Sequence, residues 1–434
     1  MKVLESLLAA FALGASLACG AAVLDVQREI DAVAERGGGV VRVAAGEHEA
    51  RPFVLRSNVT LELAEGAVLL ASTNIADYAA ALGERCFVGA EGATNVAIVG
   101  RGVIDGRGAE FREVAGLKGE SQPQALPVLM RFTRCRGLRL ENFTYRRGAA
   151  WGCHLRNCDG VEVRRVKCFN HVNNTNDGID VESANVVIED CDIDADDDAI
   201  AFKTESDKSF AVTNVVIRNC RLASCCNAVK FGTGSYSDFR DVTIEGCSLL
   251  RAKGNHRFSW WKQIPGVTNR ICGISGIALE VVDGGRMENV TVRNIDMEGY
   301  QTPIFVRHHR RHDPPAGKET YLRNVLIENV SGVADSRIAS SITGVPGLRP
   351  SGITLRNVSL VVPGGGTAAD AAAHVPEKDG AYPESFMFDR MPLPAYGFYI
   401  RHADGVVLEN VKVEPATPDA RPPVVADDAS VNML

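Results

Sequence analysis

The sequence predicts an all-β, single-domain parallel β-helix, in which short strands wind into stacked coils. A six-residue phrase recurs along the chain, with the form apolar–x–apolar–x–Asn/Gly/Asp–apolar or Cys. Its central copies begin at residues 161, 186, 215 and 242, which is the period of a solenoid. No copy adjoins a helix-length apolar pattern. Because one coil cannot bury its own apolar face, neighbouring coils must stack about 4.8 Å apart.

Each copy of the phrase alternates apolar and polar residues, as a half-buried strand does. The copies are "VTLELA" (59–64), "LRLENF" (138–143), "VEVRRV" (161–166), "VVIEDC" (186–191), "VVIRNC" (215–220), "VTIEGC" (242–247), "VTVRNI" (290–295), "VLIENV" (325–330), "ITLRNV" (353–358) and "VVLENV" (406–411). A leucine-rich horseshoe is the competing solenoid, but its leucine-dominated repeat and regular connector are not visible.

Three cysteines close successive copies of the phrase, at Cys191, Cys220 and Cys247. Stacking places them in one buried slot, where small thiols pack well. Aligned strand positions do not by themselves give disulfide geometry, so we expect these thiols to be reduced, with an occasional disulfide left open. The pair Cys225–Cys226 lacks a matching Cys/His pair nearby, so no zinc site is predicted.

The two ends of the coil carry other patterns. Residues 24–36 predict an amphipathic helix, followed by a glycine turn and a strand, and this unit would cap the first coil. Residues 363–400 contain "PGGG" and "YPESFMFDRMPLPAYGFY" and few strand phrases. We expect them to form a long loop over one face.

Residues 1–22 resemble a secretory signal, with Lys2, an apolar run and small residues near Ala21. The prediction is a secreted or periplasmic protein with residues 23–434 as its β-helix domain. Lipid attachment at Cys19 is the alternative, although the preceding "SLA" is a poor lipidation box. The apolar run is too short for a membrane span, and no other stretch could cross a membrane. The net charge of −7, with no basic face to offset it, argues against a nucleic-acid partner.

Two acidic stretches lie one coil apart, "NNTNDGIDVES" (173–183) and "DADDDAIAFK" (194–203). Aligning Asp177 with Asp198 places Ile179 beside Ile200 and Val181 beside Phe202, all pointing inward. The outward neighbours are then Asp180 beside Ala201, and Glu182 beside Lys203. We expect the last pair to form a surface ion pair.

The next coil, "CCNAVKFGTGS" (225–235), places Lys230 on the same outward strip as Asp180 and Ala201. Four acids would then gather on this strip: Asp177, Asp180, Asp197 and Asp198. Hydrolysis of a glycosidic bond needs one protonated and one ionised carboxyl group. Crowded carboxylates raise one another's pKa, which supplies the protonated member. A hydrated turn is the plain alternative for 196–198.

The motifs "TNDGID", "ADDDAIAFK", "SNVTLELAEGAVLLAS" (57–72) and "GVIDGRG" (102–108) together resemble glycoside hydrolase family 28. The resemblance covers roughly 24–415 and extends to "AAWGC" (149–153). It implies a right-handed parallel β-helix and a polygalacturonase-like or rhamnogalacturonan-hydrolase-like glycosidase acting on pectin-like polysaccharide or oligosaccharide. The family resemblance also implies a monomer that needs no metal and no cofactor.

The resemblance implies roles for matching positions. Asn176 and Asp177 fall on the family's Asn-Thr-Asp motif, and Asp197 and Asp198 on its paired aspartates. Asp197 would be the general acid. Asp177 and Asp198 would hold and deprotonate the attacking water, with inversion of configuration.

The sequence departs from the family's motifs at two sites that bind the substrate. The family's His-Gly motif falls on Asn227-Ala228, and its uronate-binding Arg-x-Lys pair falls on Ala278 and Glu280. An exo-acting enzyme, or one acting on a neutral glycan, therefore fits at least as well as an endo-polygalacturonase. Lys230 or the run "RHHRRH" (307–312) could replace the missing cations, and we expect the histidines of that run to lie on a solvated loop. The candidate substrate-binding residues are Asn176, Asp180, Lys203, Asn227, Lys230, Glu280, Arg307 and His308.

Two other functions remain open. A polysaccharide lyase on the same fold would hold Ca²⁺ with Asp196–Asp198 and abstract a proton with a base such as Lys230. A non-catalytic glycan-binding protein would retain the β-helix fold without the catalytic activity. Trp260 and Trp261, within the long loop 254–274, could stack on a sugar ring in either kind of enzyme.

Overall fold

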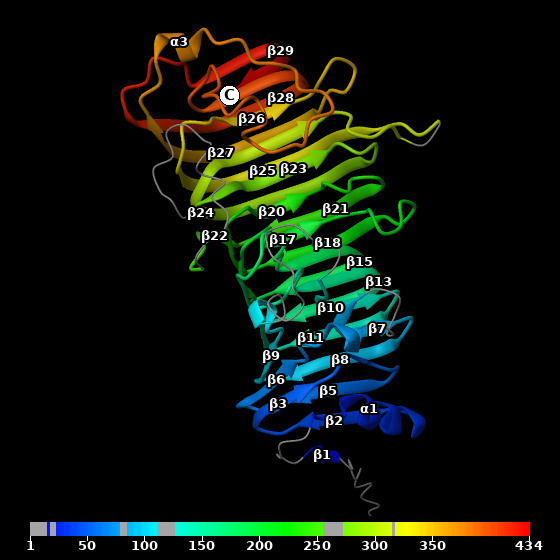
Figure 1. Cartoon of the computed structure of the whole chain (residues 1–434). Helices are drawn as coiled ribbons and strands as arrows, with labels where there is room; N and C mark the ends of the chain where they lie inside the picture. The colour runs from blue at the N-terminus through cyan, green and yellow to red at the C-terminus, as the bar shows by residue number, and fades with distance from the viewer. Residues whose placement is uncertain (1–14, 18–22, 79–84, 111–125, 255–271, 315–316) are drawn as a thin grey trace, which may run out of the picture.

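A computed structural model of the chain describes residues 15–17, 23–78, 85–110, 126–254, 272–314 and 317–434. The described strands pair in parallel and wind into an elongated stack of coils, with α1 at one end and β29 at the other (Figure 1). The predicted parallel β-helix is confirmed.

The strands form three parallel stacks that run the length of the molecule, as the strand pairings define them. The first stack contains β1 (Ala15–Leu17), β2 (Gly39–Val43), β5 (Val59–Leu63), β8 (Thr94–Gly100), β11 (Arg136–Glu141), β18 (Val212–Arg218), β21 (Asp238–Glu245), β25 (Tyr321–Ala334) and β27 (Ser351–Gly364). The second contains β3 (Gly46–Ala50), β6 (Ala67–Ala71), β9 (Val103–Asp105), β12 (Thr144–Arg146), β14 (Lys167–Asn170), β16 (Asp192–Ala195), β19 (Arg221–Ser224) and β22 (Ser248–Arg251). The third contains β4 (Phe53–Val54), β7 (Cys86–Glu91), β10 (Val128–Thr133), β17 (Ile200–Phe202), β20 (Asn227–Phe231), β23 (Gly273–Val281) and β26 (Ser340–Thr343).

Seven longer strands turn a corner and serve more than one stack. They are β25 and β27, whose C-terminal parts continue the second stack, together with β13 (Cys153–Arg164), β15 (Ile179–Glu189), β24 (Arg286–His308), β28 (Phe398–Thr417) and β29 (Val424–Met433).

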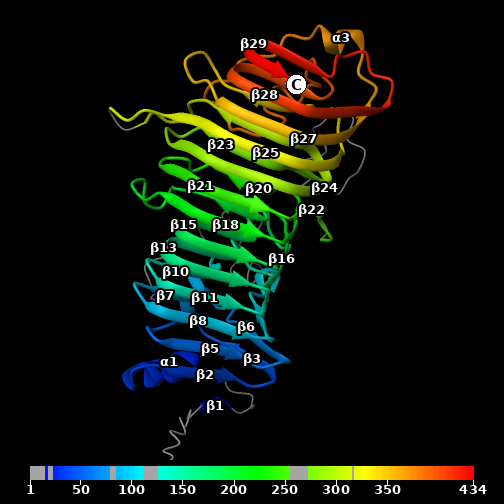
Figure 2. The ribbon, with the colours of Figure 1, turned by 180° about the vertical axis from the view of Figure 1, so that it is seen from behind.

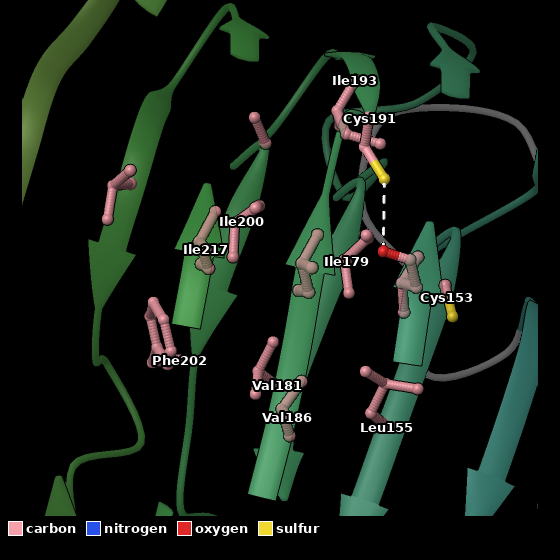
Figure 3. Packing of buried hydrophobic residues seen from close by; sticks show 14 of the residues in the cluster. Cys153, Leu155, Ile179, Val181, Val186, Cys191, Ile193, Ile200, Phe202 and Ile217 are labelled. Atoms are coloured by element: carbon pink, nitrogen blue, oxygen red, sulfur yellow. Dashed lines mark hydrogen bonds between the residues drawn. The ribbon is translucent and has the colours of Figure 1, made fainter. Parts of the chain in front are cut away.

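The repeated phrase lies in the first stack, with its copies in register. The first apolar position of each copy is the partner of the same position in the next coil. This row is Leu138, Val161, Val186, Val215, Val242, Val290, Val325 and Ile353. The inward residues of the third stack are also aligned, with Cys153, Ile179 and Ile200 in one row and Leu155, Val181 and Phe202 in the next (Figure 3).

The fifth position of the phrase makes the turn out of the first stack. Asn329, Asn357 and Asn410 occupy it with φ of 53°, 51° and 50°. Asparagine tolerates this left-handed conformation better than most residues. The Asn357 amide donates to Asn329 Oδ1 at 3.0 Å, and the Asn410 amide donates to Asn357 Oδ1 at 2.9 Å. The asparagines therefore link neighbouring coils as well as turn the chain.

The cysteine slot is buried as expected. Cys191, Cys220 and Cys247 are each at most 2% exposed, and the Cys220 amide donates to Cys247 Sγ at 3.5 Å. All eleven cysteines of the described segments are buried, and no two of them are joined by a disulfide, as expected for the slot of Cys191, Cys220 and Cys247. Cys19 lies outside the described residues.

The predicted N-terminal cap is also confirmed. Helix α1 (Val26–Glu35) buries Val26, Ile30 and Val33 against the first coils, and Asp25 caps it by accepting from the Arg28 amide at 3.1 Å. The turn after the helix requires glycine at Gly38, where φ is 119° and a Cβ would lie 2.5 Å from the Asn58 carbonyl oxygen. Residues 15–17, inside the expected signal segment, form β1 beside β2. The rest of 1–22 is outside the described residues. Within the described part of the chain, the helices are all too short or too polar to cross a membrane.

The long loop near the C-terminus covers one face, as predicted. Residues 365–397 connect β27 to β28 and carry the short helix α3 (Ala368–Ala371) and no strand (Figures 1 and 2). Met387, Phe388 and Leu393 of this connection pack against Phe305 and Tyr399, two outward-facing residues of the third stack. The 365–397 connection thus lies on the outer face of that stack.

Candidate active site

The predicted alignment of the acids is confirmed in the third stack. The Gly178 amide donates to the Asp198 carbonyl at 2.8 Å, and the Ala199 amide donates to the Asn227 carbonyl at 2.9 Å. Asp177, Asp198 and Asn227 therefore occupy equivalent positions in three successive coils, with Asp177 and Asp198 just before β15 and β17 and Asn227 as the first residue of β20. The outward residues Asp180, Ala201, Lys230 and Ala278 then follow one another in register.

Asp197 and Asp198 present their carboxyl groups to each other. One oxygen of each lies within 4.8 Å of the other and of the Cys226 sulfur. Asn227 holds Asp198, because its backbone amide and its side-chain Nδ2 both donate to Asp198 Oδ1, at 3.1 and 2.8 Å. Asp198 is 7% exposed, whereas Asp197 is only half-buried. Asp197 is thus the member of the pair that a substrate can reach.

Lys203 joins two of the acids. Its Nζ lies 3.2 Å from Asp177 Oδ2 and 3.2 Å from Asp180 Oδ1, and 4.2 Å from the centre of the Trp151 ring. The expected pair of Lys203 with Glu182 is wrong. Glu182 is already bound by His154 Nε2 at 2.9 Å and by the backbone and hydroxyl of Ser206. Within the described segments, the carboxylates of Asp177 and Asp180 are not bound by other side chains in this way, so they attract the Lys203 ammonium group more strongly.

The surroundings of these acids and of Lys203 shift their pKa values. Burial and the charges of Asp177 and Asp198 raise the pKa of Asp197 well above its usual range. Burial also raises the pKa of Asp198, although the positive charge of Lys230 opposes this rise. Burial and Asp177 raise the pKa of Asp180 well above normal. Burial lowers the pKa of Lys203, but Asp177 and Asp180 more than reverse this, so the lysine stays charged.

Asn176 braces the turn that carries Asp177. Its Oδ1 accepts from the Val172 and Asn173 amides at 2.7 and 2.5 Å, and its Nδ2 donates to the Gly148 and Ala150 carbonyls at 3.0 and 2.6 Å. Both amide hydrogens are therefore used by the backbone, and the side chain is fully buried.

Lys230 lies one coil beyond Lys203, also between two acids. Its Nζ is 3.0 Å from Glu280 Oε1 and 2.8 Å from Glu384 Oε1, and all three side chains are at most 5% exposed. Asp180, which lies on the same outward strip, is bound by Lys203 instead. Glu384 Oε2 also accepts from Asn227 Nδ2 at 3.5 Å, so the 365–397 connection reaches the residue that holds Asp198. Glu384 was missed from the sequence because it stands in no repeat, and no local pattern marks it.

Arg307 and His308 are buried at the end of β24, so the expected solvated loop is wrong for this part of "RHHRRH". Arg307 donates to Thr343 Oγ1 at 3.2 Å and to the carbonyls of Gly344 and Glu377 at 3.0 and 2.9 Å. His308 and His309 are 1% and 2% exposed. The strand continues through Arg307 and His308, and the 365–397 connection covers it. Further along the run, the side chains of Arg310 and His312 reach solvent, and His312 pairs with Asp283 at 2.8 Å.

Asp196 points away from the two aspartates that follow it. Its carboxylate contacts His171 Nδ1 at 3.2 Å, while Asp194 contacts His171 Nε2 at 2.7 Å. Burial lowers the pKa of His171, but these two carboxylates raise it to about 9. The three aspartates proposed for Ca²⁺ are therefore split between two clusters. Among the described residues, two donor sets are compact enough to hold a cation: His171, Asp196 and Cys225, and Asp197, Asp198 and Cys226. His171 and Asp198 in these sets already bind protein partners.

Among the aromatic residues considered from the sequence, Trp151 lies beside Lys203, at the edge of the acid cluster. Trp260 and Trp261 lie outside the described residues.

Comparison with known proteins agrees with this architecture. A probable polygalacturonase from Vitis vinifera is 25% identical over 368 residues, covering 77% of this chain and 70% of the relative. Polygalacturonase-2 from Solanum lycopersicum is 21% identical over 301 residues, covering 68% of this chain and 60% of the relative.

Solved structures show the same fold. An exopolygalacturonase from Thermotoga maritima has a TM-score of 0.63 at 16% identity, covering 89% of this chain and 86% of its own. A family 28 exopolygalacturonase from Yersinia enterocolitica has a TM-score of 0.65 at 17% identity, covering 94% of this chain and 74% of its own. The family model for glycosyl hydrolases family 28 matches residues 53–379. The chain belongs to glycosyl hydrolases family 28.

Proposed function

We propose that this glycosidase hydrolyses its substrate with Asp197 as general acid and with Asp177 and Asp198 as the groups that orient and deprotonate water. Asp197 would give its proton to the leaving glycosidic oxygen as the C–O bond breaks. A water held by Asp177 and Asp198 would attack the anomeric carbon from the opposite face and give up its proton to them. The product would have inverted configuration.

One observation carries this assignment: the half-buried Asp197 and the buried Asp198 face each other in different environments. Asp198 accepts two hydrogen bonds from Asn227, which favour its ionised form. The Asp197 carboxyl group is hydrogen-bonded by the Cys226 thiol, a weak donor, and burial together with the charges of Asp177 and Asp198 raises its pKa. Paired carboxyl groups that differ in this way supply an acid and a base at one pH.

The substrate class that fits best is a pectin-like polysaccharide or oligosaccharide, as the polygalacturonase relatives suggest. The 365–397 connection supports exo action, because it covers the outer face of β24 and β28 at Phe305 and Tyr399. A glycan bound at the acids would be blocked from continuing along that face. Only short products would then leave the site.

Several further properties belong to the same proposal. Residues 23–434 would form one catalytic domain that acts as a monomer. Residues 1–22 would direct export to the periplasm or the medium, with lipidation at Cys19 as the alternative. Asn176, Asn227 and Lys203 would act by positioning Asp177 and Asp198, since their polar groups bind these acids or the turns beneath them.

The lyase alternative has less support. Asp196 is bound to His171 rather than grouped with Asp197 and Asp198, and Lys230 is enclosed by Glu280 and Glu384. A lysine held between two carboxylates stays protonated and is a poor base.

The test is hydrolysis of a panel of pectic and neutral glycans, with analysis of the reducing ends, by the wild type and Asp197→Asn. The amide cannot donate an acidic proton, so activity on every substrate should fall by at least about a hundredfold. Asp192→Asn, which alters a half-exposed aspartate on neighbouring β16, is the matched control and should retain activity. Full activity in Asp197→Asn would show that Asp197 is not the acid. Products that absorb in the ultraviolet, lost on chelation, would instead indicate a lyase.

A further inference from the structure

Two lysines lie on the outer face of the third stack beside the acids, and each is enclosed by two carboxylates. Lys203 contacts Asp177 and Asp180, both at 3.2 Å. Lys230 contacts Glu280 and Glu384 at 3.0 and 2.8 Å. The lysine side chains are 13% and 1% exposed. Each ammonium group is therefore already paired with two carboxylates, so neither is available to bind an anionic substrate.

Each lysine forms a group with the two acids that it contacts, and the net charge of each group is zero or negative. Asp180 and Glu280 are fully buried, and neither makes a regular hydrogen bond in the described part of the chain. Burial raises the pKa of both carboxyl groups well above normal, and burial raises that of Glu384 as well. With one acid of a group ionised beside its lysine, the group has no net charge. If all the acids were ionised, each group would instead carry a charge of −1. In neither case does a positive charge remain for a ligand.

The remaining polar surface near Lys230 suits a sugar without charge. Tyr382 of the 365–397 connection is 57% exposed, and its hydroxyl accepts from Thr233 Oγ1 at 3.4 Å. Its ring lies 5.9 Å from Lys230 Nζ and 5.0 Å from the Arg311 guanidinium. Arg311 is itself paired with Asp283 at 3.4 Å. An exposed aromatic face packs against the C–H face of a pyranose ring and requires no charge on the sugar.

We propose that the site takes a glycosyl unit that carries no carboxylate charge, and that Glu280 and Glu384 impose this selection by neutralising Lys230. The inference rests on the proposed function and deepens it. A free uronate would add a negative charge beside Asp177 and Asp198, and the two lysines described beside these acids are already paired with carboxylates. A neutral sugar, or a uronate whose carboxyl group is esterified, would avoid this repulsion.

The first experiment compares substrates that differ in charge alone. Homogalacturonan oligomers with free carboxylates and the same oligomers as methyl esters share every linkage. The wild type should show a kcat/KM at least about tenfold higher on the esterified form, and this preference should shrink as salt screens the repulsion. Neutral aryl α-galactosides and α-rhamnosides, assayed in parallel, separate a requirement for the ester from acceptance of any uncharged sugar.

The second experiment frees Lys230. The double variant Glu280→Gln/Glu384→Gln keeps the side-chain shapes and leaves the ammonium without a counter-ion. Both residues must change, because in a single variant the remaining acid would ionise and neutralise the lysine again. The ratio of kcat/KM for free over esterified oligomers should rise by roughly tenfold, the effect of about 1.4 kcal/mol. Asp389→Asn removes a carboxylate from the same connection, at an exposed ion pair with Lys378, and should leave the ratio unchanged.

The outcomes separate the two proposals. Faster cleavage of the free oligomers by the wild type, abolished in Asp197→Asn, would overturn the charge selection and leave the hydrolase assignment standing. Cleavage of uncharged substrates with an unchanged ratio in a folded double variant would remove Glu280 and Glu384 from the mechanism of selection. Cleavage of no substrate in the panel would overturn both proposals. If the double variant does not fold, the wild-type preference still decides the charge selection.

Discussion

At the scale of single residues, the chemistry of Asp197 depends on the charges that surround it. Asp177 and Asp198 raise its pKa, whereas Lys203 lowers it. Lys203 also lowers the pKa of Asp198. The lysine therefore sets the pH at which the acid is protonated while the base is ionised, without contacting either carboxyl group in the hydrogen-bond network described above.

Replacing Lys203 by methionine should move the whole pH profile to higher values. Activity is expected to be bell-shaped, falling at high pH when Asp197 loses its proton and at low pH when the bases gain one. Loss of the positive charge disfavours the ionised form of both aspartates, so both limbs should shift upward. The measurement is kcat/KM against pH. Lys208→Met, which removes an exposed lysine that stacks on Tyr236, is the control. An unshifted profile would show that Lys203 acts only on the packing of the site.

At the scale of structural elements, the turn after the repeated phrase depends on a residue in the left-handed backbone conformation, most often an asparagine. Asn357 has a φ of 51° and exchanges side-chain hydrogen bonds with Asn329 and Asn410 in the adjacent coils. Backbone strain and inter-coil hydrogen bonding are separable at this position, because glycine accepts the conformation and lacks the amide.

Asn357→Ala should lower the free energy of unfolding by about 2 kcal/mol, since alanine is strained at positive φ and both amide hydrogen bonds are lost. Asn357→Gly should cost about 1 kcal/mol, because only the hydrogen bonds are lost and they are exposed. Urea unfolding of the two variants measures the difference. Equal losses would assign the whole effect to the hydrogen bonds and none to the backbone.

At the scale of the whole molecule, the coils depend on their neighbours, and the outer side of the first coil is described only with the short strand β1 and helix α1. Helix α1 covers its open end with Val26, Ile30 and Val33, each at most 2% exposed. In a stack of repeats, loss of an end cap loosens the adjacent coils first.

Ile30→Ala should therefore destabilise the protein by about 2–4 kcal/mol, as expected for a buried aliphatic side chain. Hydrogen exchange should quicken in β2 and β5 before it changes near Asp197. Glu35→Ala, at an exposed position of the same helix, is the control and should have little effect. Uniformly faster exchange along the whole chain would mean that the coils unfold as one unit rather than from the end.

The sequence by itself determined the coil, the register and the acids. The phrase repeats at a fixed position in each coil, and parallel stacking turns equal sequence positions into spatial neighbours. Asp177 could therefore be aligned with Asp198, and Asp180 with Ala201 and Lys230, by counting. Residues outside the repeat cannot be aligned by counting in this way. Only the tertiary structure decided that Lys203 turns to Asp177 and Asp180 rather than to Glu182, because rotamers and competing partners choose among neighbours at similar distances. Only the fold of the irregular 365–397 connection brought Glu384 to Lys230, across more than 150 residues of chain, since no periodicity fixes where such a connection lies.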